Sequence, residues 1–392
     1  MAFYNNDETA ARISKVQAML EGSGLDAALI YYDILNIANG WYITGWCPQF
    51  ESGFVLIPKA GDALVLGGCE SAEFAKMDSG VKEILTFSAF MQPGLEFFNF
   101  EMHDFRKLQQ RLQKQGAGLK KIGIVGMDIM PAGILRKVEA EMEDCTLADI
   151  TADYELFRLT KSKWEIDMML KAAGICDEGY AAMAKAIRPG ASDMEIAAEA
   201  ESACLRGGAN GFGFKTIVAP GERINGIITT TSGNAMQAGE MAMLGLSPRY
   251  YGYSGAIGDT LPVSGEYTAE QRDLMNRIRE AFRLTRGKLG PGKPIRVADE
   301  AGMDYLRKCG WGDQLVCQFV HSTGLNECEG VYYLNPDSSM EMRPGMTVMI
   351  DVSLFGIPKL HGGRVETGYV ITETGHMPLS PKADAMFSEE IG

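Results

Sequence analysis

The chain has 392 residues, of which 46% are hydrophobic and 22% are charged, a composition typical of globular proteins. Its 37 Lys and Arg against 51 Asp and Glu give a net charge of −14, which argues against a nucleic-acid partner because phosphates would be repelled. No apolar run reaches the roughly 18 residues of a membrane span, and no secretion signal is visible at the N-terminus. The eight cysteines are scattered without a CxxC pair, so we expect reduced thiols, no zinc knuckle, no membrane partner and a cytoplasmic location.

The first part of the chain alternates helical and strand patterns. Apolar residues at helical spacing predict helices, and short apolar runs between Gly-rich turns predict buried strands. The expected helices are 11–24 and 134–142, the expected strands are 25–32 and 120–126, and the expected hairpin is 52–68. This alternation predicts an α/β domain that occupies residues 1–155.

A long helix over 159–187, with Ser162 as its candidate N-cap, opens the second part. The segments 187–208 and 289–310 both carry Pro-Gly, a short spacer and an Ala-rich helix. This similarity predicts a weak internal duplication, although Pro-Gly also precedes many unrelated helices.

Between these two segments, residues 240–265 read as two strands joined at Pro248-Arg249. An amphipathic helix follows over 266–287, and Thr268 with Gln271 forms a capping box at its start. The last third of the chain is rich in strands, which we expect at 315–324, 345–355 and 364–372.

Three late motifs stand in the order and spacing of the pita-bread superfamily of aminopeptidase P, prolidase, methionine aminopeptidase and creatinase. They are VHSTGLNECEG (320–330), RPGMTVMIDVSLF (343–355) and GGRVETGYVIT (362–372). Residues 252–274 resemble the strand pair and helix of that superfamily, and 11–75 resembles the N-terminal domain of its creatinase and aminopeptidase P branch. The resemblance implies a creatinase-like, ribonuclease-H-like α/β domain over 1–155, an α+β pita-bread catalytic domain over 156–392, and a homodimer.

In the peptidases of this superfamily five residues bind two metal ions, and the resemblance carries these positions to Gly245, Ala256, His321, Asp351 and Glu366. Glycine and alanine side chains offer no donor atom, so a dinuclear site is not expected. The three remaining residues could form a facial triad for one metal. Creatinase, which resembles this case, works without metal, so we expect no cofactor and keep the mononuclear site as an alternative.

Other residues near these motifs are candidates for binding a substrate. They are Asp259, Arg364, His361, Glu329 and Tyr253. Asp259 follows the position of a creatinase carboxylate by one residue, a shift that normally points to the other face of a strand unless a bulge intervenes. Arg364 could clamp a substrate carboxylate, with a surface salt bridge as the alternative, and Glu329 could instead be a solvated loop residue.

Two histidines that assist the peptidases fall on Ile228 and Cys328, which argues against Xaa-Pro peptidase activity. We therefore expect a metal-independent, creatinase-like hydrolase that cleaves a non-peptide C–N bond in an amidine, guanidine or cyclic amide bearing a cationic group. His321 would shuttle the proton, while Asp351 and Glu366 would orient it or activate water. A mononuclear hydrolase or lyase, an Xaa-Pro peptidase-like protein and a non-catalytic pseudopeptidase that binds other molecules remain alternatives.

Overall fold

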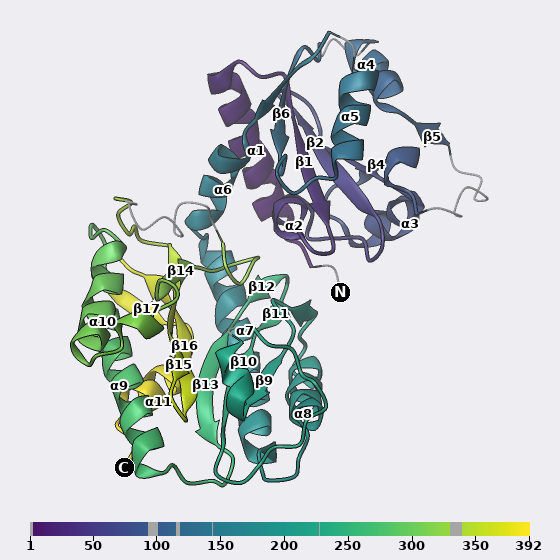
Figure 1. The fold of residues 1–392 in the computed structure, drawn as a ribbon. Coiled ribbons are helices and arrows are strands. Elements are labelled where there is room, and N and C mark those ends of the chain that lie inside the picture. Colours follow the sequence, from purple (N-terminus) through teal and green to yellow (C-terminus); the bar gives the residue numbers. More distant parts are fainter. Residues whose placement is uncertain (1–2, 93–100, 115–117, 143, 227, 330–338) are drawn as a thin grey trace. The chain divides into compact units, whose positions relative to one another are not determined.

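The computed structural model describes residues 3–92, 101–114, 118–142, 144–226, 228–329 and 339–392 (Figure 1). The chain divides into two compact units, Met1–Arg158 and Leu159–Gly392, each with its own hydrophobic core. Among the described residues, no helix is both long enough and apolar enough to cross a membrane.

The first unit is built on a seven-stranded sheet in the order β5-β4-β3-β2-β1-β6-β7. Strand β2 runs antiparallel to both of its neighbours, and the other pairs are parallel. The strands are β1 Ala27–Asp33, β2 Ser52–Pro58, β3 Leu64–Gly67, β4 Glu83–Phe87, β5 Met102–His103, β6 Lys121–Val125 and β7 Thr146–Asp149. The helices are α1 Asn6–Ser23, α2 Ala38–Thr44, α3 Cys69–Asp78, α4 Phe105–Lys114, α5 Ala132–Glu141 and α6 Thr151–Leu159.

Local sequence signals account for most of this unit. Helix α1 begins at the N-cap Asn5, whose side chain accepts from two backbone N–H groups, and ends at Gly24 in the left-handed conformation. The continuous apolar run of β1 is buried between its two neighbours in the sheet. The expected helices, strands and hairpin are confirmed, and the α/β class with them.

The second unit contains a six-stranded antiparallel sheet in the order β14-β15-β16-β13-β10-β9, with β17 paired to β16. Its strands are β9 Ile217–Pro220, β10 Met241–Leu246, β13 Ile257–Pro262, β14 Val320–Ser322, β15 Thr347–Ile357, β16 His361–Ile371 and β17 His376–Pro378. A small second sheet joins β8 Gly211–Phe212, β11 Pro248–Tyr250 and β12 Tyr253–Ser254. The helices are α7 Lys163–Ala186, α8 Asp193–Arg206, α9 Ala269–Arg286, α10 Arg296–Lys308 and α11 Pro381–Ser388.

Both predicted helix starts in this unit are confirmed as complete capping boxes. Ser162 and Glu165 begin α7, and Thr268 and Gln271 begin α9. Helix α9 packs against the long strands β15 and β16, and helices α7 and α8 contact β13, β10 and β9 of the same sheet (Figure 1). The helices therefore cover the outside of the sheet, as the pita-bread resemblance predicts.

The two Pro-Gly segments make the same backbone contacts, which supports the predicted duplication. The N–H of Gly190 donates to Met236 O, and the N–H of Gly292 donates to Met342 O, both at 2.9 Å. Each glycine has a positive φ and is followed by a helix, α8 or α10. Each contacted methionine in turn precedes a strand of the main sheet, β10 or β15.

The predicted turn at Pro248-Arg249 is wrong. These two residues lie inside β11, and the chain reverses at Tyr251 and Gly252, which have φ values of 52° and 83°. Two consecutive residues in the left-handed region suit a tight hairpin, and glycine is the residue that adopts this region most easily.

Candidate functional site

Three strands of the second unit bring the predicted catalytic residues together. Asp351 on β15 lies directly opposite Glu366 on β16, so both side chains lie on the same face of the sheet. Arg364 is two residues before Glu366 and shares that face. His321 on β14 pairs with Met349, two residues before Asp351, and completes the group. We call these four residues, together with Glu327, the His321 cluster.

The ionic contacts inside the His321 cluster are short. The Arg364 guanidinium donates to both Asp351 oxygens, at 3.0 Å from Nε and 2.7 Å from Nη2, and its Nη2 lies 2.8 Å from Glu366 Oε2. His321 Nε2 lies 3.7 Å from Glu366 Oε1 and 3.8 Å from Glu327 Oε1. Yet no described residue donates a hydrogen bond to either Glu366 oxygen or to Glu327 Oε1. Arg364 and His321 nevertheless stabilise the charge of Glu366, and carboxylate oxygens without an aligned hydrogen bond can still accept one from a ligand.

Burial and mutual contacts shift the ionisation of the cluster in opposite directions. Burial disfavours the charged imidazole, but Glu327, Cys328 and Glu366 outweigh it and raise the pKa of His321 well above its usual value. Burial likewise opposes ionisation of Glu366, but Arg364 and His321 outweigh it and lower its pKa. At neutral pH this arrangement favours a protonated His321 beside an ionised Glu366.

Glu327 is a member of the cluster that the sequence did not reveal. Burial raises its pKa to about 7, against the opposing charge of His321. It lies in the segment between His321 and Glu329, which has no regular periodicity from which a side-chain direction could be predicted. The only available signal was its place six residues after His321 in the same motif.

The fold and the cluster can be compared with known proteins. A model of metallopeptidase family M24 matches residues 167–373, and a model of the creatinase/prolidase N-terminal domain matches residues 12–160. The chain belongs to metallopeptidase family M24. The predicted resemblance to the creatinase and aminopeptidase P superfamily is therefore confirmed, and the M24 chain is a hydrolase of that superfamily.

Relatives of this M24 chain resemble it over most of its length. A Xaa-Pro dipeptidase of Pyrococcus horikoshii is 24% identical over 369 residues, which cover 94% of this chain and 96% of the relative. The solved prolidase from Pyrococcus horikoshii has a TM-score of 0.79 at 22% identity and covers 94% of this chain and 97% of its own. An X-Pro aminopeptidase structure from Thermotoga maritima has a TM-score of 0.80 at 19% identity, with 94% and 97% covered. These structures confirm the fold.

The residues of this M24 chain do not fit a two-metal centre. Gly245 and Ala256 supply no ligand atoms, and Arg364 takes up space beside the first of them, 3.4 Å from where a Cβ of residue 245 would stand. A Cβ at Gly258 would come within 2.9 Å of Arg364 Nε, so that glycine also leaves room for the guanidinium. The Arg364 guanidinium therefore supplies positive charge on the acidic face of the sheet.

One metal ion remains geometrically conceivable. Ligand atoms of His321, Asp351 and Glu366 all lie within 4.8 Å of one another, and no other such group occurs among the described residues. However, Arg364 and Ser353 already donate to the Asp351 oxygens, so an ion bound there would compete with both donors. The three residues could hold one cation only after Asp351 had given up part of these contacts.

Of the five predicted substrate-binding residues, only Arg364 reaches the cluster, and it contacts the protein's own carboxylates. Asp259 lies on the opposite face, because no bulge offsets the one-residue shift, and its fully buried side chain accepts from the Tyr180 hydroxyl at 2.5 Å, which favours a structural role. His361 lies at the start of β16, where the register shifts and its own φ is 65°, and its Nδ1 lies 3.2 Å from Asn225 Nδ2.

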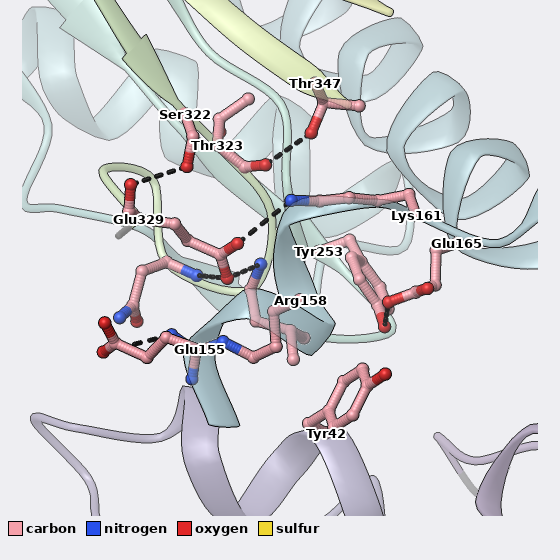
Figure 2. Close-up of polar contacts among 12 residues, drawn as sticks. Tyr42, Glu155, Arg158, Lys161, Glu165, Tyr253, Ser322, Thr323, Glu329 and Thr347 are labelled. Carbon is pink, nitrogen blue, oxygen red and sulfur yellow. Dashed lines mark hydrogen bonds and ion pairs between the residues drawn. The ribbon is translucent and has the colours of Figure 1, made fainter. Parts of the chain in front are cut away.

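Tyr253 and Glu329 lie outside the cluster, and both side chains make buried structural contacts (Figure 2). The Tyr253 hydroxyl donates to Glu165 Oε1 of α7 at 2.7 Å. Glu329 Oε2 lies 3.1 Å from Lys161 Nζ, and Oε1 accepts from the backbone N–H groups of Leu325 and Asn326. Both charged side chains of this pair are at most 2% exposed. Because Glu329 bonds to Lys161 and to the loop backbone at Leu325 and Asn326, it stabilises the loop that carries Glu327.

The two positions that hold histidines in the peptidases are both exposed here. Ile228 is 74% exposed, and Cys328 is exposed as well. Although Cys328 is exposed, its thiol lies beside His321 and helps to raise the pKa of that imidazole.

Proposed function

We propose that this chain hydrolyses an amide-type C–N bond of a small substrate at the His321 cluster. The observation that carries the proposal is a histidine, 12% exposed, whose Nε2 lies within 3.8 Å of two carboxylates, Glu366 and Glu327, and three of these carboxylate oxygens have no aligned hydrogen bond from the described residues. Membership in family M24 supports hydrolysis as the reaction class.

The names of the relatives favour an Xaa-Pro dipeptide as the first substrate to test, because they include Xaa-Pro dipeptidases and a Xaa-Pro aminopeptidase. The ionic balance of the cluster is compatible with this substrate. Arg364 offsets Asp351 and part of Glu366, and the remaining acidic oxygens would attract the cationic amino end of a dipeptide.

The roles of the residues follow from their ionisation. His321, whose pKa is raised, would donate its Nε2 proton to the departing nitrogen as general acid. Glu366, whose pKa is lowered, would accept a proton from the attacking water, whose oxygen bonds to the carbonyl carbon. Asp351 would hold Arg364 in place, so that the guanidinium stabilises the negative charge that develops on the substrate oxygen.

A second candidate is the metal-independent, creatinase-like cleavage of an amidine, guanidine or cyclic amide. The observation that favours it is the absence of ligand atoms at Gly245 and Ala256, with Arg364 beside the former. Such a substrate would bring its own positive charge to the carboxylates of the cluster.

One set of measurements tests both candidates. Protein purified without added metal is analysed for metal content, then assayed with Xaa-Pro dipeptides and with a panel of amidines and guanidines, each with and without a chelator. We expect less than one equivalent of metal and hydrolysis that resists the chelator. If the chelator removed one equivalent of metal together with the activity, the mononuclear site would be established. Two equivalents of bound metal would contradict the conclusion that Gly245 and Ala256 prevent a dinuclear site. Binding without turnover of any substrate would favour the pseudopeptidase.

We also propose a homodimer, which the superfamily resemblance implies. Light scattering at micromolar concentration should give twice the chain mass of 42.7 kDa. A monomer under these conditions would contradict this proposal and leave the hydrolase proposal untouched.

A further inference from the structure

A cavity of about 700 Å³ lies in the first unit, between helix α3 and the segment that precedes β2. Aromatic side chains form part of its lining, namely Trp46, Phe50 and Phe74. Phe50 is 75% exposed and Phe74 is 52% exposed, so two large apolar rings face solvent at its edge. A concave site with exposed aromatic surface is the usual form of a small-molecule site.

The charged residues of this cavity are all acidic. Four of the described lining residues are carboxylates and none is Lys or Arg; the four are Glu51, Glu70, Glu73 and Asp78. The Glu70 carboxylate is already satisfied within the protein, because it accepts from the backbone N–H groups of residues 49, 50 and 51. Glu73 and Asp78 are exposed to solvent. An anionic ligand would be repelled from this lining.

Glu51 differs from the other three carboxylates because it is buried and only partly satisfied. The residue is 3% exposed. Its Oε2 accepts from the N–H of Glu70 at 2.8 Å, and the backbone of Gln92 and Cys69 also stabilises the carboxylate, although Oε1 has no aligned hydrogen bond of its own from a described residue. A Cβ at Gly68 would collide with this carboxylate, so the glycine leaves the space that Glu51 needs. A buried carboxylate oxygen without a donor is costly unless a counter-charge approaches it.

We propose that this cavity binds a small organic cation, an amine or quaternary ammonium with an apolar body. Glu51 supplies the counter-charge, and the faces of Trp46, Phe50 and Phe74 supply the aromatic surface that attracts such cations. A metal ion fits less well, because among the described residues only the His321 cluster gathers enough ligand atoms to hold one. The proposal concerns the first unit alone and does not depend on the proposed hydrolase activity.

Calorimetric titration of the full chain tests the proposal with two probes of nearly the same shape, choline and its neutral analogue 3,3-dimethylbutan-1-ol. We expect choline to bind and the neutral alcohol to bind at least roughly tenfold more weakly, because only the cation interacts with the carboxylate and the aromatic faces. Equal affinity for both probes, or no choline binding, would overturn the proposal.

Variants locate the binding. Glu51→Gln keeps an acceptor for the Glu70 N–H but removes the charge, and should weaken choline binding roughly tenfold. Phe50→Ala alters an exposed ring without a folding role, so it tests the site even if Glu51→Gln is unstable. Asp62→Asn, at an exposed acidic residue outside the lining, should leave binding unchanged. If Glu366→Gln lost choline binding while Glu51→Gln and Phe50→Ala had no effect, the cation would bind at the His321 cluster. That result would disprove the proposed site in the first unit.

Discussion

The second unit contains two buried ionic groups that differ in how their oxygens are satisfied. In the Lys161–Glu329 pair, one Glu329 oxygen faces the ammonium and the other accepts from two backbone N–H groups. In the His321 cluster, both Glu366 oxygens and one Glu327 oxygen lack hydrogen bonds from the described residues, although charges of opposite sign lie nearby. The difference contrasts a pair that stabilises a loop with the cluster that we propose binds a substrate.

The largest expected effect lies in the cluster. His321→Asn should fold normally, still bind substrate and lose roughly 10²- to 10⁴-fold in turnover, because it removes the proton donor. Melting and turnover are measured on the same preparation, with His103→Asn in the first unit as control. Glu366→Gln should damage the same step, and the double variant should lose less than the two single losses combined. Full activity per folded His321→Asn molecule would remove this residue from the mechanism.

The Lys161–Glu329 pair should show the opposite pattern. Lys161→Met leaves a buried carboxylate without its cation and should lower the free energy of unfolding by about 3–5 kcal/mol. Chemical denaturation measures the change, and adding Glu329→Gln should restore part of it. Lys163→Met removes an exposed pair with Asp167 and should cost at most about 1 kcal/mol. If both lysine variants lost the same free energy of unfolding, the buried pair would contribute no more to stability than the exposed one.

Asp259 and Glu366 offer a sharper comparison, because they lie on opposite faces of the same sheet. Asp259→Asn disturbs the acceptor of the Tyr180 hydroxyl and should cost about 1–3 kcal/mol of stability. Turnover per folded molecule should stay near that of the original chain, since Asp259 points away from the cluster. Denaturation and turnover assays on the same protein separate the two effects. A loss of turnover without a loss of stability would show that Asp259 contributes to the active site.

The smallest expected effect is a change in pH dependence. Burial raises the pKa of Glu327 from 4.5 to about 7, so folding favours its protonated form. Stability from this group is complete below pH 4.5 and is lost as the pH rises through about 7. Glu327→Gln should therefore reduce the fall in stability across this window. The reduction should be partial, because burial also raises the pKa of Asp299 to about 7. If Glu327→Gln left the dependence of stability on pH unchanged, the Glu327 side chain would be exposed to solvent.

Much of the fold followed from local signals. Caps at Ser162 and Thr268 are confirmed because a cap depends on residues within one turn of the helix. The turn after β11 was misplaced, because proline suggested a reversal whereas the positive φ angles at Tyr251 and Gly252 produce it. The side-chain directions of the substrate-binding candidates could not be predicted from the sequence. A position near a motif does not fix the direction of a side chain in a loop, or on a strand whose bulges are unknown.

By itself the sequence determined the family motifs, the loss of two metal ligands at Gly245 and Ala256, and the grouping of His321, Asp351 and Glu366. The ligand positions and the grouping are what the superfamily resemblance implies, and the two-residue period of strands places Arg364 and Glu366 on one face. The tertiary structure alone decided which charges find partners. Lys161 meets Glu329 across 168 residues, and Glu327 turns towards His321, because such contacts depend on how distant segments pack and on the free energy of burying each charge.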